Sequence, residues 1–147
     1  LVHCIVADGR WRLILFAPPG ERGLGAITQF CSFLEHDDDS PLRHFPAGSD
    51  LDAHIDTRAV FQEPHHDLDL AAMPAILLPA KGRYGLTDYE KIFCVDHKNG
   101  PNIFDRRGID RERGAVIIVR PDQYVAGVLA LDGMEELQSF FAAILRR

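Results

Sequence analysis

Apolar residues in this chain fall into short continuous runs and into stripes at helical spacing. The continuous runs are bounded by polar, glycine and proline residues, a pattern that favours β-strands. They cover Trp11 to Ala17, Ile55 to Gln62, Lys91 to Val95 and Ala115 to Val119. A further run, Val2 to Val6, is expected to form a hairpin with the first of these across Asp8-Gly9.

A helical stripe lies between the first two long runs. Within Leu24 to Glu35, apolar residues at helical spacing predict an amphipathic helix. The acidic run Asp37 to Asp39 should end it, because negative charge is unfavourable at a helix C-terminus. Among the connections, Ser40 to Ser49 and Lys81 to Tyr89 predict surface loops, Asn102 to Gly108 predicts a helical turn, and the state of Met73 to Pro79 stays open.

The last third of the chain, residues 108–147, has the most regular pattern. Ala115 to Val119 is typical of a strand buried on both faces, Pro121 favours a turn, and Tyr124 to Leu131 returns antiparallel. Asp132 and Glu135 resemble a capping box ahead of a helix. Its apolar face comprises Met134, Leu137, Phe140, Phe141, Ile144 and Leu145. Thioredoxin-like domains finish in such a ββα unit.

Composition describes an acidic globular chain. Its 147 residues suit one domain covering 1–147, with 46% hydrophobic residues, 26% charged residues and a net charge of −6. Dispersed lysines and arginines disfavour nucleic acid, and the apolar runs are too short for a membrane helix. Three cysteines without paired spacing argue against a disulfide framework, and no signal peptide is visible. We therefore expect a cytoplasmic protein with neither a nucleic-acid nor a membrane partner.

Four segments resemble a known family. They are RGAVIIVRPDQYVAGVLALD, GRYGLTDYEKIFCVD, NIFDRRGID and ADGRWRLILFA, and they resemble the C-terminal domain of FAD-dependent aromatic hydroxylases. VRPDQYVA marks the wider class of flavoprotein hydroxylases. YGLTDYEK and IFDRRGID narrow the resemblance to the branch of phenol 2-monooxygenase and 3-hydroxybenzoate 4-monooxygenase. It covers essentially the whole chain.

The resemblance implies a thioredoxin-like α/β fold, with a central mixed β-sheet flanked by helices. It implies a parent enzyme in which FAD-binding and substrate domains precede this one, and which uses FAD and NAD(P)H to hydroxylate a phenolic ring. In the family this domain mainly supports subunit association, so a homodimer is expected. The chain opens at Leu1 inside an expected strand, which suggests a piece of something longer. No catalytic or flavin-binding residue of the family can be carried onto it.

The glycines before the first helix do not match a dinucleotide-binding turn. That turn needs G-x-G-x-x-G, so that pyrophosphate can rest on amides at the helix N-terminus. Gly20, Gly23 and Gly25 have the spacing G-x-x-G-x-G instead. We therefore expect no cofactor to be bound by this chain.

Thiol and metal chemistry are also disfavoured. The C-x-x-C pair of disulfide oxidoreductases is absent. Thr28, three residues before Cys31, leaves a thiol peroxidase as an alternative, but Leu24 stands where that site would have proline. Cys31 and Cys94 are interpreted as packing residues. His65-His66-Asp67 is interpreted as a solvated loop rather than a metal site, because adjacent extended side chains point apart.

The remaining candidates are contact residues. Arg83, Tyr84, Leu86 and Tyr89 combine guanidinium, aromatic and apolar groups in one loop, a composition favoured at interfaces. Packing of Tyr84 and Leu86 on the core is the alternative. Trp11 could pack on a neighbouring domain or inward.

These patterns favour a non-catalytic association domain of a flavin-dependent, phenol-type aromatic monooxygenase. The alternative of a different class is a stand-alone protein of the same fold that binds or converts an aromatic metabolite. That alternative needs an enclosed pocket lined by polar groups such as Arg58, His54 or Tyr84.

Overall fold

The computed structural model describes residues 5–6, 8–45, 50, 52–96, 98 and 100–145. They form two sheets, three α-helices and three short 3-10 helices. The strands are β1 (Trp11–Phe16), β2 (Ile55–Phe61), β3 (Ala80–Lys81), β4 (Leu86–Thr87), β5 (Ile92–Cys94), β6 (Ala115–Val119) and β7 (Val125–Leu129). The helices are α1 (Gly20–His36), η2 (Pro41–His44), η3 (Leu70–Ala72), η4 (Ala75–Leu77), α2 (Ile103–Arg107) and α3 (Met134–Leu145).

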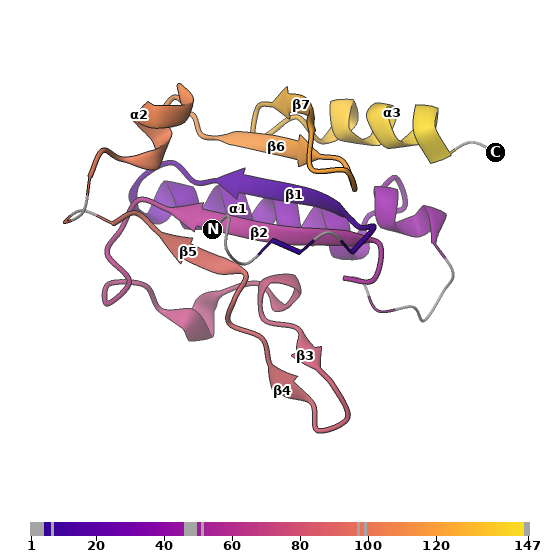
Figure 1. Cartoon of the computed structure of the whole chain (residues 1–147), viewed down its shortest axis with the longest axis horizontal. Coiled ribbons are helices and arrows are strands. Elements are labelled where there is room, and N and C mark those ends of the chain that lie inside the picture. Colours follow the sequence, from indigo (N-terminus) through magenta and orange to yellow (C-terminus); the bar gives the residue numbers. More distant parts are fainter. Residues whose placement is uncertain are drawn as a thin grey trace.

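The main sheet has the order β5-β2-β1-β6-β7. β1 and β5 both run parallel to β2, whereas β6 is antiparallel to β1 and β7 is antiparallel to β6. A parallel β1-α1-β2 unit is therefore joined to a C-terminal β6-β7-α3 unit in one mixed sheet (Figure 1). This arrangement confirms the thioredoxin-like α/β class with its ββα ending.

The two faces of the sheet are covered unequally. On the first face, alternate residues of β1 and β6, such as Leu13 and Val116, pack with Phe30 of α1 and Phe141 of α3 in the larger core. The second face carries a smaller apolar cluster around Phe16 and Phe104. Among the described residues, only the short helix α2 and loop segments pack there, so part of this second face stays open to solvent.

Most predicted elements are present, with shifted ends. α1 begins at Gly20, four residues before the predicted start, and α3 begins at Met134, with Gly133 O accepting its first helical hydrogen bond from Leu137 N. The predicted loop after α1 is partly buried, because Ser40 caps η2 and hydrogen-bonds Leu34 O at 2.7 Å.

The predicted N-terminal strand is wrong for the part that the structure describes. Ile5 and Val6 lie outside any strand, while residues 2–4 fall outside the described ranges. β1 therefore pairs with β2 and β6 rather than with an N-terminal hairpin partner. Among the described residues, no helix is long and apolar enough to cross a membrane.

Candidate functional site

Ala80–Tyr89 forms a hairpin that extends away from the main sheet, and we call it the arm (Figure 1). Lys81 of β3 pairs with Leu86 of β4, and the turn between them is closed by Gly85 N donating to Gly82 O at 3.2 Å. Both glycines have positive φ, at 68° and 62°, which a residue with a side chain adopts at a cost. The sequence predicted a loop here, whereas the structure shows a short antiparallel pair of strands, β3 and β4.

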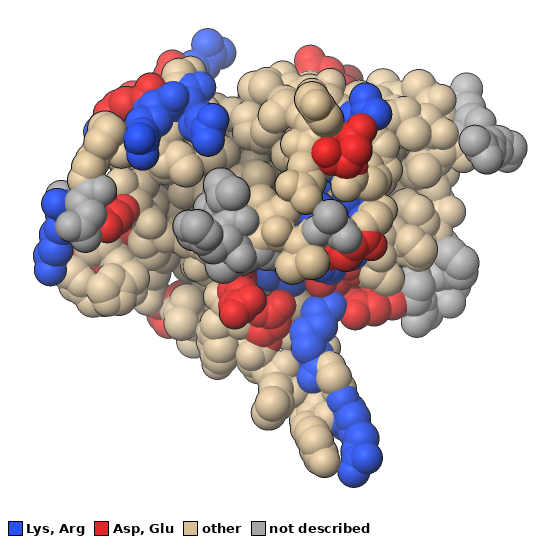
Figure 2. Space-filling view, in the orientation of Figure 1, with Lys and Arg blue, Asp and Glu red and all other residues tan. Residues whose placement is uncertain are grey.

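The arm presents its large side chains to solvent. Tyr84 is 76% exposed, Leu86 69% and Tyr89 59%, and none of the three belongs to either apolar cluster. The guanidinium of Arg83 lies 5.0 Å from the centre of the Tyr84 ring, in cation–π contact. All four predicted contact residues thus lie together on one projection, which Figure 2 shows standing clear of the body. Packing of Tyr84 and Leu86 on the core is not what the structure shows.

Ion pairs attach the base of the arm to the body. Lys81 Nζ lies 2.8 Å from a carboxylate oxygen of Asp50 and 2.8 Å from one of Asp52. Asp52, which is buried, also binds Lys91 and accepts a hydrogen bond from Arg10 at 2.9 Å. One buried carboxylate therefore connects the arm to the interior.

Behind Asp52 lies a buried network of charges. Lys91, only 1% exposed, sits between Asp52 and Asp56, with its Nζ 2.6 Å from Asp56. Arg58 donates to Asp56 at 2.9 Å, and the fully buried Arg12 lies 3.4 Å from the same carboxylate. Burial by itself raises the pKa of Asp56, but the charges and hydrogen bonds of Lys91 and Arg58 outweigh it and lower that pKa below its usual value.

Sequence reasoning missed this network, although a signal was present. Arg12, Asp56 and Arg58 interrupt the apolar runs of two strands that become central in the sheet. A buried charge is costly unless it is paired, so charges inside buried runs indicate partners elsewhere in the chain. Arg12 and Arg58 pair with Asp56 of the same sheet, and Lys91 directly precedes β5. Asp52, by contrast, lies in a loop that no local pattern identifies.

The N-terminus of α1 is already occupied by a side chain of the same chain. Gly20 N donates to the Glu63 carboxylate, which places negative charge where a dinucleotide pyrophosphate would otherwise bind. A Cβ at Gly23 would lie 1.9 Å from Pro18 O, so this glycine lets α1 pack closely against the turn that precedes it. The residues of this turn do not fit FAD or NAD(P)H.

Both described cysteines lack the environment of a reactive thiol. Cys31 is fully buried among apolar side chains in the middle of α1, and burial raises the pKa of its thiol far above the usual value. Cys94 is half-buried, and burial raises its thiol pKa as well. Because the thiolate is the reactive form, the geometry does not favour a thiol peroxidase. Cys4 lies outside the described residues.

The residues suggested for an aromatic-metabolite pocket do not converge. Arg58 is bound to Asp56, the His54 ring stacks on Phe45 at 4.2 Å, and Tyr84 is on the arm. Trp11 packs inward, with ring centres 5.8 Å from Phe140 and 5.3 Å from Phe141.

His65 and His66 are exposed, as expected of a solvated loop. Among the described residues, no three His, Cys, Asp or Glu side chains gather into a group that could hold a metal ion.

A family comparison matches the whole chain. Residues 1–147 match the model described as "Phenol hydroxylase, C-terminal dimerisation domain". Among curated proteins, the chain is 49% identical to 3-hydroxybenzoate 4-monooxygenase of Comamonas testosteroni and 33% identical to FAD-dependent monooxygenase terD of Aspergillus terreus. Each match covers 99% of this chain but only 24% and 25% of the relative. The chain thus spans about a quarter of the length of these relatives.

Likeness to solved structures is weaker. A thioredoxin-like superfamily protein, SPOA0173, is similar over 96% of this chain and 83% of its own, with 11% identity and a TM-score of 0.46. Peroxiredoxin Q of Xanthomonas campestris is similar over 94% of this chain and 79% of its own, with 12% identity and a TM-score of 0.43. Both scores are too low to add to the fold assignment, which rests on the strand order.

Proposed function

Because this chain belongs to the family of phenol hydroxylase C-terminal dimerisation domains, we propose that it joins two copies of a flavin-dependent monooxygenase that acts on a phenolic ring. The names of the relatives support the parent activity, and the family description supports pairing of identical subunits. The chain's own contribution is association, and it supplies no residue to the oxidation.

The arm carries this proposal. Two tyrosines and a leucine are exposed on one projection, beside a guanidinium, and such groups are enriched where interfaces are energetically strongest. A monomer gains nothing from keeping them in water. Buried against a second copy, an arm from each subunit gives the self-complementary contact that a two-fold dimer requires.

In the proposed parent enzyme, FAD and NAD(P)H bind to domains other than this one. The turn before α1 supports this division, since Glu63 takes the place that a pyrophosphate needs. A cytoplasmic location and a single domain over residues 1–147 remain part of the proposal.

The test is the self-association of the chain when Tyr84→Ser and Leu86→Ser are combined. Removal of two hot-spot side chains should cost at least about 2 kcal/mol, or a roughly 30-fold weaker dimer by sedimentation equilibrium. Tyr124→Ser is the matched control, since Tyr124 is 72% exposed but lies outside the arm. Equal dimer affinity in the arm variant and the control would contradict the proposal.

A further inference from the structure

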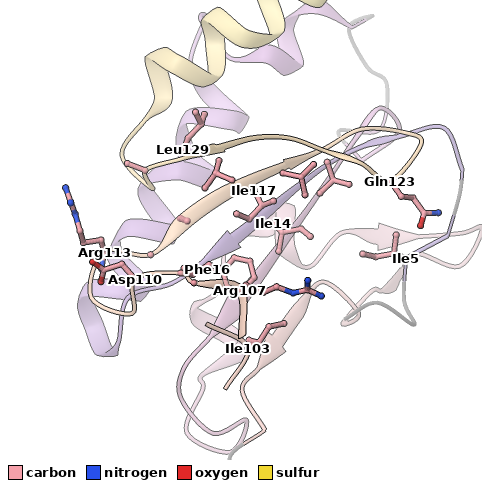
Figure 3. A pocket seen from close by; sticks show the side chains of 18 residues that line it. Ile5, Ile14, Phe16, Ile103, Arg107, Asp110, Arg113, Ile117, Gln123 and Leu129 are labelled. Carbon is pink, nitrogen blue, oxygen red and sulfur yellow. The ribbon is translucent and has the colours of Figure 1, made fainter. Parts of the chain in front are cut away.

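An apolar groove lies on the second, less covered face of the main sheet, and it is distinct from the arm. Its volume is about 760 Å³. Ile14 and Phe16 of β1, Ile117 of β6 and Leu129 of β7 line it, while α2 and the loop after it form one wall (Figure 3). No arm residue lines this groove.

The open side of the groove is unusually apolar for a surface. Val125 and Val128 of β7, which both line it, are 61% and 62% exposed. β7 is also an edge strand, so its outer backbone groups have no partner strand within the described sheet. A contiguous apolar patch beside a free edge marks a surface that another protein element covers.

The position of Ile5 indicates which partner covers the groove. Ile5 itself lines the groove, so the four residues before it can carry the chain no more than about 14 Å away. In the relatives, roughly three-quarters of the length lies outside the matched segment, and the matched family is a C-terminal domain. Whatever precedes the domain is therefore tethered beside the groove, at a high effective concentration.

The rim adds a requirement of charge. Arg107 and Arg113 are exposed lining residues of the groove, and Asp110 lines it with them. Figure 3 shows the side chain of Arg107 reaching across the groove and that of Arg113 pointing away from it. A surface that fills the groove would place a carboxylate or a carbonyl oxygen opposite Arg107.

We propose that this groove docks the domain that precedes this one in the longer relatives, through an apolar ridge flanked by acidic groups. This inference rests on the proposed function, and it assigns the two kinds of association to two surfaces. The arm binds a second copy, whereas the groove binds the rest of the same polypeptide.

The experiment compares the chain of 147 residues with the complete product of its gene, by hydrogen–deuterium exchange. Peptides from β6 and β7 should exchange at least tenfold more slowly in the complete protein, because the docked domain covers them. Val128→Asp should return them to the rates of the 147-residue chain. Leu70→Asp, at a residue 41% exposed away from the groove, should leave the protection unchanged.

Three results would overturn the proposal. The β6 and β7 peptides could exchange equally in both forms, or the gene could encode nothing ahead of Leu1. Val128→Asp could also abolish self-association of the 147-residue chain, which would assign the groove to a second copy. Sedimentation of the 147-residue chain with Tyr84→Ser and Leu86→Ser tests the dimer proposal separately. Failure of the groove proposal can therefore be distinguished from failure of the proposed function.

Discussion

Replacing Lys91 with methionine is expected to destabilise the fold, although methionine fills nearly the same space. Lys91 is 1% exposed and contacts both Asp52 and Asp56. Its removal leaves two buried carboxylates without the cation that lies between them. Each carboxylate still bears the cost of its desolvation, but the attraction of Lys91 no longer offsets that cost.

The magnitude follows from what remains around the two carboxylates. Loss of one partner of a buried ion pair typically costs about 3–5 kcal/mol. Asp52 keeps Arg10 at 2.9 Å and Asp56 keeps Arg58 at 2.9 Å, so the lower end applies, about 3 kcal/mol. With a urea slope of about 1.5 kcal/mol/M, the unfolding midpoint should fall by about 2 M.

The assay is urea unfolding followed by tryptophan fluorescence. Trp11 is the only tryptophan of the sequence, and its ring packs on Phe140 and Phe141, so its emission reports the docking of α3. Lys98→Met is the matched control, because Lys98 is exposed and its loss should stay within about 0.5 kcal/mol. Equal midpoints for the two variants would refute the reasoning about the buried network.

Three further outcomes are expected. Gly23→Ala should lower the thermal midpoint, since its Cβ would meet Pro18 O at 1.9 Å, whereas Gly25→Ala, with nothing within 4 Å, should raise stability by up to about 1 kcal/mol. In a variant without the other two cysteines, Cys31 should react with a thiol reagent only as fast as the chain unfolds; a rapid reaction would contradict its burial. Because the pKa of Asp56 is lowered on folding, its contribution is present above the ordinary pKa of 3.8 and is lost as pH falls through the lowered value. Asp56→Asn should flatten the decline of the urea midpoint below about pH 5.

Local patterns predicted those helices and strands whose formation depends mainly on their own residues. The β6-β7-α3 ending and the helix with Ile27 and Leu34 on one face follow from periodicity that packing then preserves. The glycine closure of α2 also followed, since Gly108 adopts φ 65° at its C-cap. In each of these cases the deciding residues lie within the element itself or directly beside it.

Features that depend on distant partners could not be predicted in this way. The run before Trp11 has strand-like composition, but β2 and β6 already occupy both edges of β1. Glu63 meets the start of α1 across more than forty residues of sequence, so no spacing rule signals it. For the candidate site, the arm's composition was visible, while its projection from the body depends on Asp50 and Asp52, which lie far from it in the sequence.

The shared carboxylate of Asp52 has a consequence for how the arm binds. Since Asp52 binds Lys81 at the base of the arm and Lys91 in the interior, the arm cannot swing without breaking the ion pair between Lys81 and Asp52. Its direction is therefore set before a partner arrives. Little freedom is left to lose on association, so a hairpin with only two short strands can suffice where a flexible loop would need a larger contact.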